Sequence, residues 1–427
     1  MKVGILAGIS RMLHSHSVAQ VVREQILMVH EAAHHPVLLA PADLQWFEAP
    51  PWLAIRAVLP PFERVKYTRL RDLSEEHGAV AVRAARALRA SCGDLDAVFA
   101  HDILYNGNNL PLAEGLRLAI GDLPETPRAW LHWIHSVPGE RRDFWTLPPR
   151  SRLVSPTEAN RELCAERFAT AAENVFRIPH ARDPRSFLLA TDLARKIVTE
   201  HRVLEAELVQ TYPMELDRAM AKGLHQVIAV FAALKALGRS VRLLVADSGR
   251  AGPAYERRVR GYREYAEHLG LGEGALVFTS SSSPPDGETL DGPRHGVPIE
   301  VVRDLMSVSN LFVYPTKSET FGLVLAEAAL SGQLLVLNSD LPVLSEVMEA
   351  GTALSFSFGG SCKGQSRRPW EELYRELARW IVAAAERDLA LRAKTCVRLT
   401  YNRQAVWRET ARCLESMGGP SPGHAGW

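Results

Sequence analysis

Along most of the chain, short continuous apolar runs alternate with segments in which apolar residues recur at the spacing of an α-helix. Short apolar runs such as KVGILAG at 2–8 and HPVLLAP at 35–41 are typical of strands buried on both faces of a parallel sheet. Between them, residues 18–33 place apolar side chains at a spacing near that of an α-helix, which predicts an amphipathic helix. The first part of the sequence therefore predicts a strand–helix–strand unit.

The same alternation continues through both halves of the chain. In the first half the pattern predicts helices over 80–91, 110–120 and 158–168, the last capped by Thr157, and strands over 95–101, 128–136 and 151–157. In the second half it predicts helices over 222–238, 255–270, 298–309 and 323–332, and strands over 240–247, 275–280, 310–316 and 334–339. The sequence thus predicts an α/β fold of two doubly wound, Rossmann-like domains that face a central cleft.

Interruptions of this pattern set the expected boundaries. Prolines and charges at 175–187 separate the two series, so we expect an N-terminal acceptor-binding domain over 1–195 and a C-terminal donor-binding domain over 196–398. Long helical periodicity over 370–416 predicts a last helix, at 399–417, that returns to the first domain. The serine- and proline-rich stretch at 280–296 predicts a mobile surface insertion, and 418–427 a disordered tail.

Composition narrows the class of protein. The chain has 427 residues with 47% hydrophobic and 23% charged side chains, which is typical of a soluble globular enzyme. The formal net charge of +1 indicates no global attraction to nucleic acid or anionic membranes. Five widely spaced cysteines without a CxxC pair indicate reduced thiols, and no apolar run is long enough for a signal peptide or a bilayer span. We therefore expect a cytoplasmic protein.

The stretch TKSETFGLVLAEAALSG at 316–332 carries the first candidate chemistry. Its predicted helix begins near Gly322, so the backbone amides of Phe321, Gly322 and Leu323 would lie free at the carboxyl edge of the sheet and suit a phosphate. Glu319 precedes the helix and Glu327 lies inside it, and carboxylates accept hydrogen bonds from sugar hydroxyls. The pattern favours a nucleotide-sugar pocket; the alternative is an ordinary cap at Glu319 and a solvated Glu327.

The segment around these glutamates closely resembles the signature of retaining glycosyltransferases of family 4, which have the GT-B architecture. The resemblance covers Glu319, the Phe321–Gly322–Leu323 run, Glu327, Gly332 and Glu346. It implies that Glu319 contacts the donor hexose, that the amides after the Phe–Gly pair meet its hydroxyls and diphosphate, and that Glu327 holds the ribose.

A second segment, YPMELDRAMAKG, resembles the R-x4-K-G motif of the same family, with looser spacing. The resemblance implies that Arg218 and Lys222 neutralise the donor diphosphate, as leaving-group stabilisation requires. The alternative is that both are solvated residues at a helix start.

The first half resembles the family only in outline. RAWLHWIHSVP is similar to a strand followed by His-Thr/Ser in the family, which implies that His135 lies beside the donor sugar, whereas His132 would face the other side and be structural. DAVFAHDI similarly implies acceptor-side roles for His101 and Asp102.

The loop AGISRMLHSHSVAQ departs from the glycine pair that family members often carry before the first helix. Gly8 remains, and His14 and His16 either take part of the phosphate contact or are merely exposed.

The resemblance implies retaining transfer of a hexose from a nucleoside-diphosphate sugar such as UDP-glucose or GDP-mannose, with the leaving phosphate as base. We expect neither a metal nor a cofactor. The D-x-D at Asp94 to Asp96 precedes its strand and lies at the wrong edge of the sheet for a catalytic metal. Neither a G-x-G-x-x-G after the first strand nor a Walker loop is present, which disfavours a dehydrogenase or kinase.

The acceptor and two alternative functions stay open at this stage. The acceptor is a small molecule, a lipid or a glycan, or it is DNA, because HWIHSVPGERRD faintly resembles a phage glucosyltransferase acting on hydroxymethylated bases. The DNA reading uses Arg141, Arg142, Arg150, Arg152, Arg161 and Arg167 beside Trp130, Trp133, Phe144 and Trp145. The other alternative is a sugar-nucleotide-binding protein without catalysis. The sequence does not define an oligomeric state.

Overall fold

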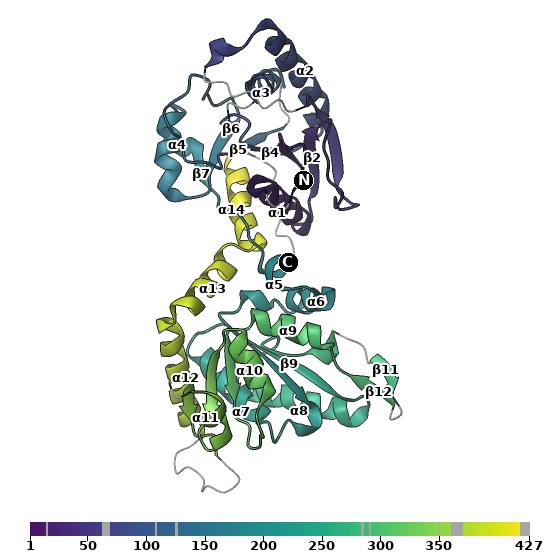
Figure 1. Cartoon of the computed structure of the whole chain (residues 1–427), viewed down its shortest axis with the longest axis vertical. Helices are drawn as coiled ribbons and strands as arrows, with labels where there is room; N and C mark the ends of the chain where they lie inside the picture. Colours follow the sequence, from purple (N-terminus) through teal and green to yellow (C-terminus); the bar gives the residue numbers. More distant parts are fainter. Residues whose placement is uncertain are drawn as a thin grey trace. The chain divides into compact units, whose positions relative to one another are not determined.

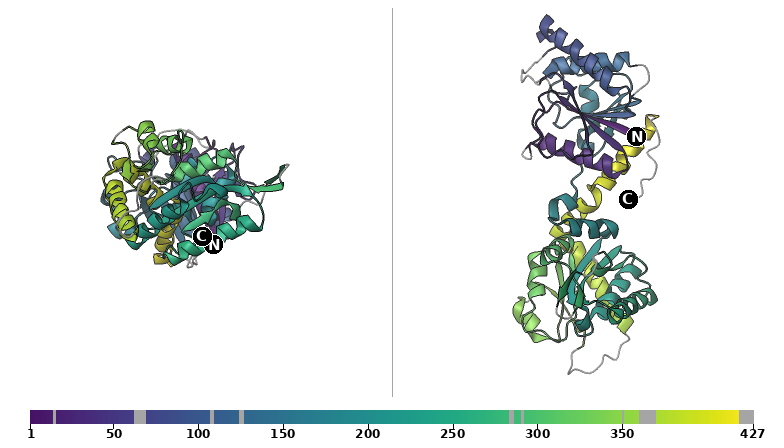
Figure 2. Two further views of the ribbon diagram at one scale, coloured as in Figure 1. Left: turned by 90° about the horizontal axis from the view of Figure 1, so that it is seen from below. Right: turned by 90° about the vertical axis from the view of Figure 1, so that its right-hand side faces the viewer.

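The computed structural model describes residues 1–13, 16–61, 69–106, 109–123, 127–282, 286–289, 292–349, 351–359 and 370–418. The chain divides into two compact units, the first containing residues 1–183 and the chain from 400 onward, and the second containing 184–399. Each unit is a sheet with helices on both faces (Figures 1 and 2). The predicted α/β fold of two Rossmann-like domains is confirmed.

In the first unit the described residues form a fully parallel sheet of seven strands in the order β3-β2-β1-β4-β5-β6-β7. The strands are β1 (Lys2–Ala7), β2 (His35–Pro41), β3 (Ala54–Leu59), β4 (Ala97–His101), β5 (Ala129–Trp133), β6 (Ser151–Ser155) and β7 (Val175–Arg177). Helices α2 (Glu75–Cys92) and α3 (Leu110–Asp122) pack on one face. The other face is covered by α1 (Ser17–Glu31) and α14 (Arg403–Ser416).

The second unit repeats this strand order. Its parallel strands β10, β9 and β8 pair in sequence, and β13, β14 and β15 form a second ladder. The strands are β8 (Leu208–Glu215), β9 (Val241–Arg250), β10 (Leu276–Phe278), β13 (Leu311–Tyr314), β14 (Leu334–Asn338) and β15 (Leu354–Phe356). Side chains join β8 to β13: Gln210 Nε2 donates to Val313 O at 3.0 Å, and Val313 N donates to Gln210 Oε1 at 2.8 Å.

The helices of the second unit also cover two faces. One face packs against α7 (Leu224–Ala236), α8 (Pro253–His268), α10 (Leu323–Leu330), α11 (Pro342–Val347) and α12 (Trp370–Arg387). The other packs against α6 (Asp192–Glu200) and α9 (Ile299–Val308), with α5 (Pro184–Leu188) beside α9. Helix α13 (Leu389–Thr400) follows α12. Among the described residues, no helix combines the length and the apolarity that crossing a bilayer requires.

The division between the units falls at residue 183 and not at the predicted 195. Helix α6 belongs to the second unit because its start is bound to the buried Asp304 of α9. The amides of Ala190 and Thr191 and the hydroxyl of Thr191 donate to Asp304 Oδ2 at 2.9, 2.7 and 2.8 Å. A capping carboxylate that takes three donors fixes this segment locally.

A buried arginine helps to anchor the returning chain to the first unit. Arg403 at the start of α14 is 4% exposed and bonds to Glu24 at 2.8 Å and to Glu31 at 2.5 Å, both on α1. A buried guanidinium needs such partners, because charge taken out of water is costly unless it is paired. Residues 419–427 of the predicted tail lie outside the described residues.

Two local expectations differ from the structure. The described part of the 280–296 insertion contains two antiparallel strands, β11 (Asp286–Thr289) and β12 (Gly292–His295), of which β12 continues onto β9. The Thr157 side chain makes no capping bond, because a 3-10 turn, Glu158–Asn160, comes before helix α4 (Arg161–Arg167). The C-terminal pattern over 370–416, which predicts one or more helices, forms three: α12, α13 and α14.

Candidate functional site

In each unit, polar side chains gather where the parallel strands end. In the second unit the centre is formed by Lys222, which follows β8, and by Glu319 and Tyr314 around the end of β13. The Lys222 ammonium and the Tyr314 hydroxyl both donate to Glu319 Oε1. The side chains of Lys222 and Glu319 are only 17% and 14% exposed. The structure thus brings together two residues that lie far apart in the sequence.

Gly223 allows this approach. It has φ +72°, and a Cβ at this position would lie 2.7 Å from Pro315 Cγ and 3.0 Å from Pro315 O. Only glycine fits a left-handed conformation with backbone this close. The turn is also tied by Lys317 N, which donates to Ala221 O at 3.1 Å. Lys222 is therefore held beside the loop that carries Glu319.

Helix α10 begins directly after this loop, at Gly322 with φ +87°. Within the described part of the chain, no group accepts a hydrogen bond from the amides of Phe321, Gly322 and Leu323. Unpaired amides at a helix start carry partial positive charge and suit an anion. The three amides predicted to bind an anion are therefore free of protein acceptors in the described part of the chain.

The remaining candidates of this unit are more exposed. Arg218 ends a 3-10 turn, Leu216–Arg218, and its charge helps to lower the pKa of Glu319. Glu327 lies on α10 and is exposed, and no hydrogen bond of its carboxylate is found among the described residues. Its expected contact with a ribose therefore remains a prediction.

Electrostatics keep the Glu319 carboxylate ionised. Burial alone would raise its pKa, but the hydrogen bonds from Lys222 and Tyr314 outweigh this effect, and the pKa lies below its ordinary value. Burial and the adjacent carboxylate together raise the pKa of Tyr314, so its hydroxyl stays a donor. The centre is a paired anion and cation with a neutral phenol.

The first unit places a chain of imidazoles at the corresponding strand ends. His101 Nδ1 lies 2.9 Å from His135 Nε2, and His135 Nδ1 lies 3.3 Å from His180 Nε2. At the far end of the chain, His101 Nε2 lies 3.0 Å from Gln25 Oε1. Asp102, with φ +54°, accepts a hydrogen bond from the amide of His135 at 2.9 Å. The predicted residues His101, Asp102 and His135 are thus brought together.

Burial keeps these imidazoles neutral. It lowers the pKa of His135 to about 3 and that of His180 to about 4, and it lowers the pKa of His101 well below its usual range. The opposite effect acts on the carboxyl group, because burial raises the pKa of Asp102 to about 6. His132, expected to be structural, is buried and lies 3.1 Å from Ser151 Oγ.

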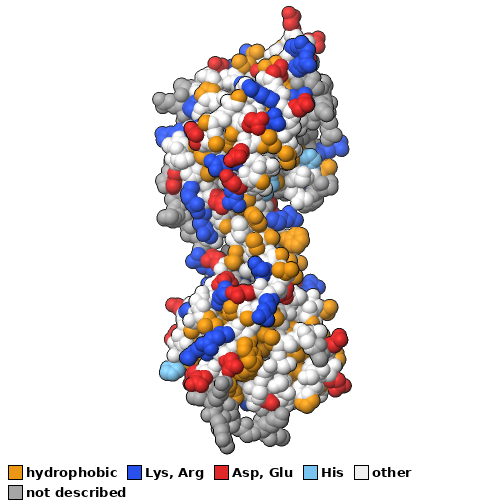
Figure 3. Space-filling model, turned by 90° about the vertical axis from the view of Figure 1, so that its left-hand side faces the viewer, with side chains coloured by type: hydrophobic (Ala, Val, Ile, Leu, Met, Phe, Trp, Pro, Cys, Tyr) orange, Lys and Arg blue, Asp and Glu red, His pale blue; other side chains and the backbone are white. Residues whose placement is uncertain are grey.

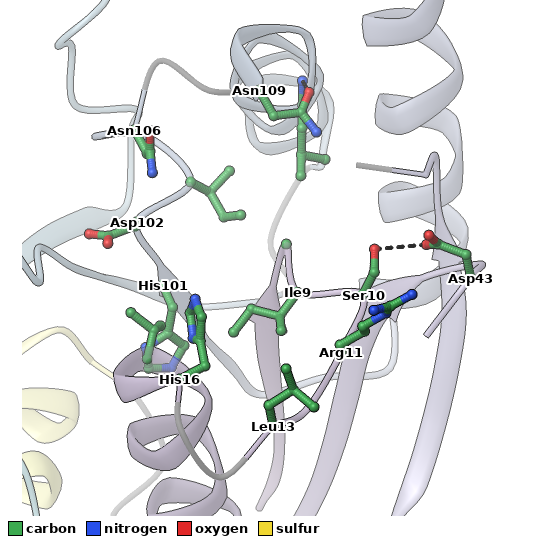
Figure 4. Close-up of a pocket in the computed structure, with 14 residues that line it drawn as sticks. Ile9, Ser10, Arg11, Leu13, His16, Asp43, His101, Asp102, Asn106 and Asn109 are labelled. Atoms are coloured by element: carbon green, nitrogen blue, oxygen red, sulfur yellow. Dashed lines mark hydrogen bonds between the residues drawn. The ribbon is translucent and has the colours of Figure 1, made fainter. Parts of the chain in front are cut away.

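A cavity of about 830 Å³ opens beside this chain (Figure 4). His101 and Asp102 enter it from the end of β4, and Ser10 and Arg11 from the loop after β1. The loop before α3 adds Asn106 and Asn109, and Gly8 also lines the cavity. The wall thus combines amide, carboxylate, hydroxyl and guanidinium groups, which are the groups that recognise polyhydroxylated or anionic small molecules.

Of the two candidate histidines in the first loop, the structure describes only His16. His16 lines the cavity, but its Nδ1 accepts the amide hydrogen of Ala19 at 3.2 Å and caps α1. Only its other ring nitrogen is therefore available to a ligand. His14 lies outside the described residues.

Several residues of these centres were missed by sequence reasoning. His180 lies in the stretch IPHARDP, which was read only as an interruption, although a histidine directly after a short strand is the signal already used for His101 and His135. Tyr314 is the last residue of β13, and an aromatic residue inside a predicted strand gives no separate signal of a site.

The D-x-D motif lies outside both centres. Its Asp94 accepts hydrogen bonds from Arg56 at 2.7 and 2.8 Å and pairs with Lys2.

Comparison with known proteins finds only distant similarity. No protein-family model matches the sequence, and no curated protein matches it significantly. Similar solved structures include a glycosyltransferase from Rickettsia africae ESF-5, with 12% identity over 98% of this chain and 99% of that chain and a TM-score of 0.35. Anabaena Alr3699/HepE in complex with UDP-glucose shows 15% identity over 97% and 100%, with a TM-score of 0.33.

The trehalose-6-phosphate synthase OtsA is a third such structure, with 13% identity over 98% of this chain and 99% of that chain and a TM-score of 0.34. The similar structures are GT-B glycosyltransferases, which is the kind of protein that the sequence resemblance predicts, whereas membership of family 4 stays a prediction. At these identities and TM-scores the likeness carries no inference about the reaction of this chain.

Proposed function

We propose that the chain is a retaining glycosyltransferase that resembles family 4 and moves a hexose from a nucleoside-diphosphate sugar to an acceptor hydroxyl without a metal. One observation carries the proposal. An ionised Glu319, held by Lys222 and Tyr314, lies two to four residues before three backbone amides at the start of α10 that have no acceptor among the described residues. Carboxylate oxygens suit sugar hydroxyls, and amides with a nearby ammonium suit a diphosphate.

The roles follow from the charges. Lys222 and Arg218 would stabilise the negative charge that develops on the departing diphosphate, together with the amides of Phe321, Gly322 and Leu323. Glu319 would bind hydroxyls of the transferred hexose through the oxygen lone pairs that Lys222 and Tyr314 leave free. Glu327 would hold the ribose.

The state of Glu319 also supports a route without a covalent intermediate. A carboxylate engaged by an ammonium and a phenol is a poor nucleophile, because attack would remove charge from two hydrogen bonds. The acceptor hydroxyl would then attack on the face that the leaving group departs from, and the leaving phosphate would take its proton.

The first unit would supply the acceptor side. Neutral His135 would lie beside the donor sugar, and Asp102 with the cavity of Figure 4 would receive the acceptor. A pKa of about 6 leaves the Asp102 carboxyl mostly ionised at neutral pH and able to accept a hydrogen bond from an acceptor hydroxyl. A small polar acceptor suits this cavity.

The test is a thermal-shift screen of the full chain against UDP-glucose, GDP-mannose and their free diphosphates. A donor at about 100 times its Kd should stabilise the folded protein by about 2.7 kcal/mol. Release of free diphosphate from the donor that stabilises the protein distinguishes an enzyme from a protein that only binds sugar nucleotides. The proposal is wrong if none of the four compounds stabilises the protein at millimolar concentration.

No observation favours the DNA alternative. Its aromatic residues belong to the core, since Trp130, Trp133, Phe144 and Trp145 are each 4% exposed or less. Arg150 and Arg161 donate to backbone carbonyls, and Arg167 pairs with Glu166. On the face drawn in Figure 3, acidic and basic side chains are interspersed. These residues do not form the expected basic surface with exposed aromatic rings.

A further inference from the structure

A second pocket, in the second unit, uses none of the residues proposed for the donor. It has a volume of about 400 Å³ and lies between α8 and the turn that follows β10. Arg260 and Arg263 line it from α8, Ser280 from the turn and His295 from the end of β12.

The two arginines are the main charges of this pocket. Neither forms an ion pair with a carboxylate anywhere in the described part of the chain, although the Arg263 guanidinium lies 5.7 Å from the centroid of the Phe278 ring. Arg258 on the same helix, by contrast, is paired with Asp217. Among the described residues, the helix thus gives Arg258 a carboxylate partner and leaves the two arginines that line the pocket without a carboxylate.

Two carboxylates lie at or near the pocket, and only one of them is exposed. Asp247 is fully buried behind the wall and accepts from the Tyr255 hydroxyl, from Thr279 Oγ1 at 3.0 Å and from the amide of Ser280 at 3.1 Å. Glu256 is the acidic side chain of the wall itself. The lining itself therefore carries two guanidinium groups and one exposed carboxylate, while the second carboxylate is buried and engaged by neutral donors.

A flat aromatic wall completes the pocket. The rings of Tyr255 and His295 stack with centroids 4.4 Å apart and an interplanar angle of 23°. The Nδ1 atom of His295 is buried and has no hydrogen-bond partner among the described residues. A buried polar atom without a partner is costly.

We infer that this pocket binds a phosphorylated small molecule, separate from the sugar donor. Guanidinium groups recognise phosphate oxygens in a planar, bidentate geometry, so Arg260 and Arg263 would hold the phosphate group. The volume exceeds that of a phosphate ion, so the organic part of the ligand would lie against Tyr255 and His295. Ser280 belongs to the turn that follows β10. A ligand bound in the pocket would therefore contact the end of this strand.

The experiment titrates the full chain with inorganic phosphate and with phenyl phosphate, at constant ionic strength, by isothermal calorimetry. The double variant Arg260→Ala/Arg263→Ala should bind both probes about tenfold or more weakly, a loss of about 1.4 kcal/mol or more. The matched control is Arg257→Ala, which removes an exposed arginine of the same helix that does not line the pocket. This control should leave both affinities within about twofold of the unchanged chain.

A second variant tests the aromatic wall. His295→Ala should weaken phenyl phosphate more than inorganic phosphate, because only the former has a ring to stack. The inference is overturned if the double variant binds both probes like the unchanged chain, or if Arg257→Ala weakens them equally. It is also overturned if the double variant loses UDP affinity in parallel, since the pocket would then belong to the nucleotide site. Failure of the proposed transfer reaction would leave these phosphate titrations interpretable.

Discussion

The two units have a similar order of parallel strands, but their polar centres differ in charge. The imidazoles of the first centre are neutral, and the second centre contains an ion pair. In the first unit, burial holds His101, His135 and His180 neutral, and they bond to one another in a chain. In the second, Lys222 and Glu319 remain charged and neutralise each other directly. One fold therefore accommodates both solutions at the carboxyl ends of its strands.

This difference has a physical consequence. A chain of neutral imidazoles avoids the cost of buried charge, but it depends on pH, because protonation of any member would place a charge in the core. A buried ion pair tolerates a wide pH range, but it requires both partners, since removal of one leaves the other uncompensated. The first unit should therefore be sensitive to acid, and the second to substitution.

The largest expected effect is acid unfolding of the first unit. The folded pKa values of its buried histidines, His101, His132, His135 and His180, lie below the ordinary value. As pH falls from about 6.5 toward 4, the unfolded chain gains protons that the folded chain does not, so stability is lost at up to about 1.4 kcal/mol per pH unit for each histidine. Asp102 opposes this loss, because its raised pKa favours the folded state as pH falls through about 6.

Pulsed hydrogen exchange at pH 7 and pH 5 measures this effect unit by unit. Peptides that contain β4 and β5 should lose protection at pH 5 before those that contain β13 and β14. Simultaneous loss in both units, or earlier loss in the second, would contradict the comparison.

The second expected effect concerns the charged centre. Glu319→Gln should lower kcat by about 10²–10³-fold, because the neutral amide leaves Lys222 unpaired and binds sugar hydroxyls more weakly. The matched control is Glu349→Gln, the same change at an exposed position. Activity is measured as release of diphosphate, and circular dichroism checks the fold. Near-normal turnover in Glu319→Gln would remove this residue from the site.

The third effect concerns the turn that positions Lys222. Gly223→Ala should lower the free energy of unfolding by about 2–3 kcal/mol, because the new Cβ meets Pro315 in a left-handed conformation. Gly238→Ala is the control: it has φ +83° but open space around the Cβ, so only the backbone strain of about 1 kcal/mol should appear. Urea unfolding compares the two. Equal losses would mean that the Pro315 contact relaxes without cost.

The smallest effect is expected at Glu327. Glu327→Ala should raise the donor KM by about tenfold, about 1.4 kcal/mol, and change kcat little, since the predicted contact is with the ribose and not with the reacting sugar. Steady-state kinetics separate the two constants. An unchanged KM would favour the simple alternative that this exposed side chain is only solvated.

Much of the fold was predictable because buried parallel strands and amphipathic helices differ in apolar period. Strand β8 was missed because Gln210 and Thr211, both fully buried, break its apolar run. Their polar groups bind β13 and the end of α9, so a buried strand appears polar in the sequence. Short strands such as β15 carry too few residues to show a period.

The candidate sites were predictable in residue type but not in geometry. The sequence resemblance nominated Lys222 and Glu319 separately, but their direct bond depends on Gly223 and Pro315, which no local pattern connects. His101 lines the cavity proposed for the acceptor, and its pairing with Gln25 and His135 through both ring nitrogens could not be predicted from the sequence. Contacts between distant strand ends arise from the tertiary fold, which short-range periodicity does not encode.

The ion pairs of Arg403 with Glu24 and Glu31 of α1 have a consequence for synthesis of the protein. The helix that carries Arg403 emerges from the ribosome only after all of 184–399 has been made. Until then one face of the first sheet lacks Val406 and Trp407, and Glu24 remains without its cation. The first unit to be translated is therefore the last to be completed, and its nascent form exposes an apolar face that chaperones would recognise.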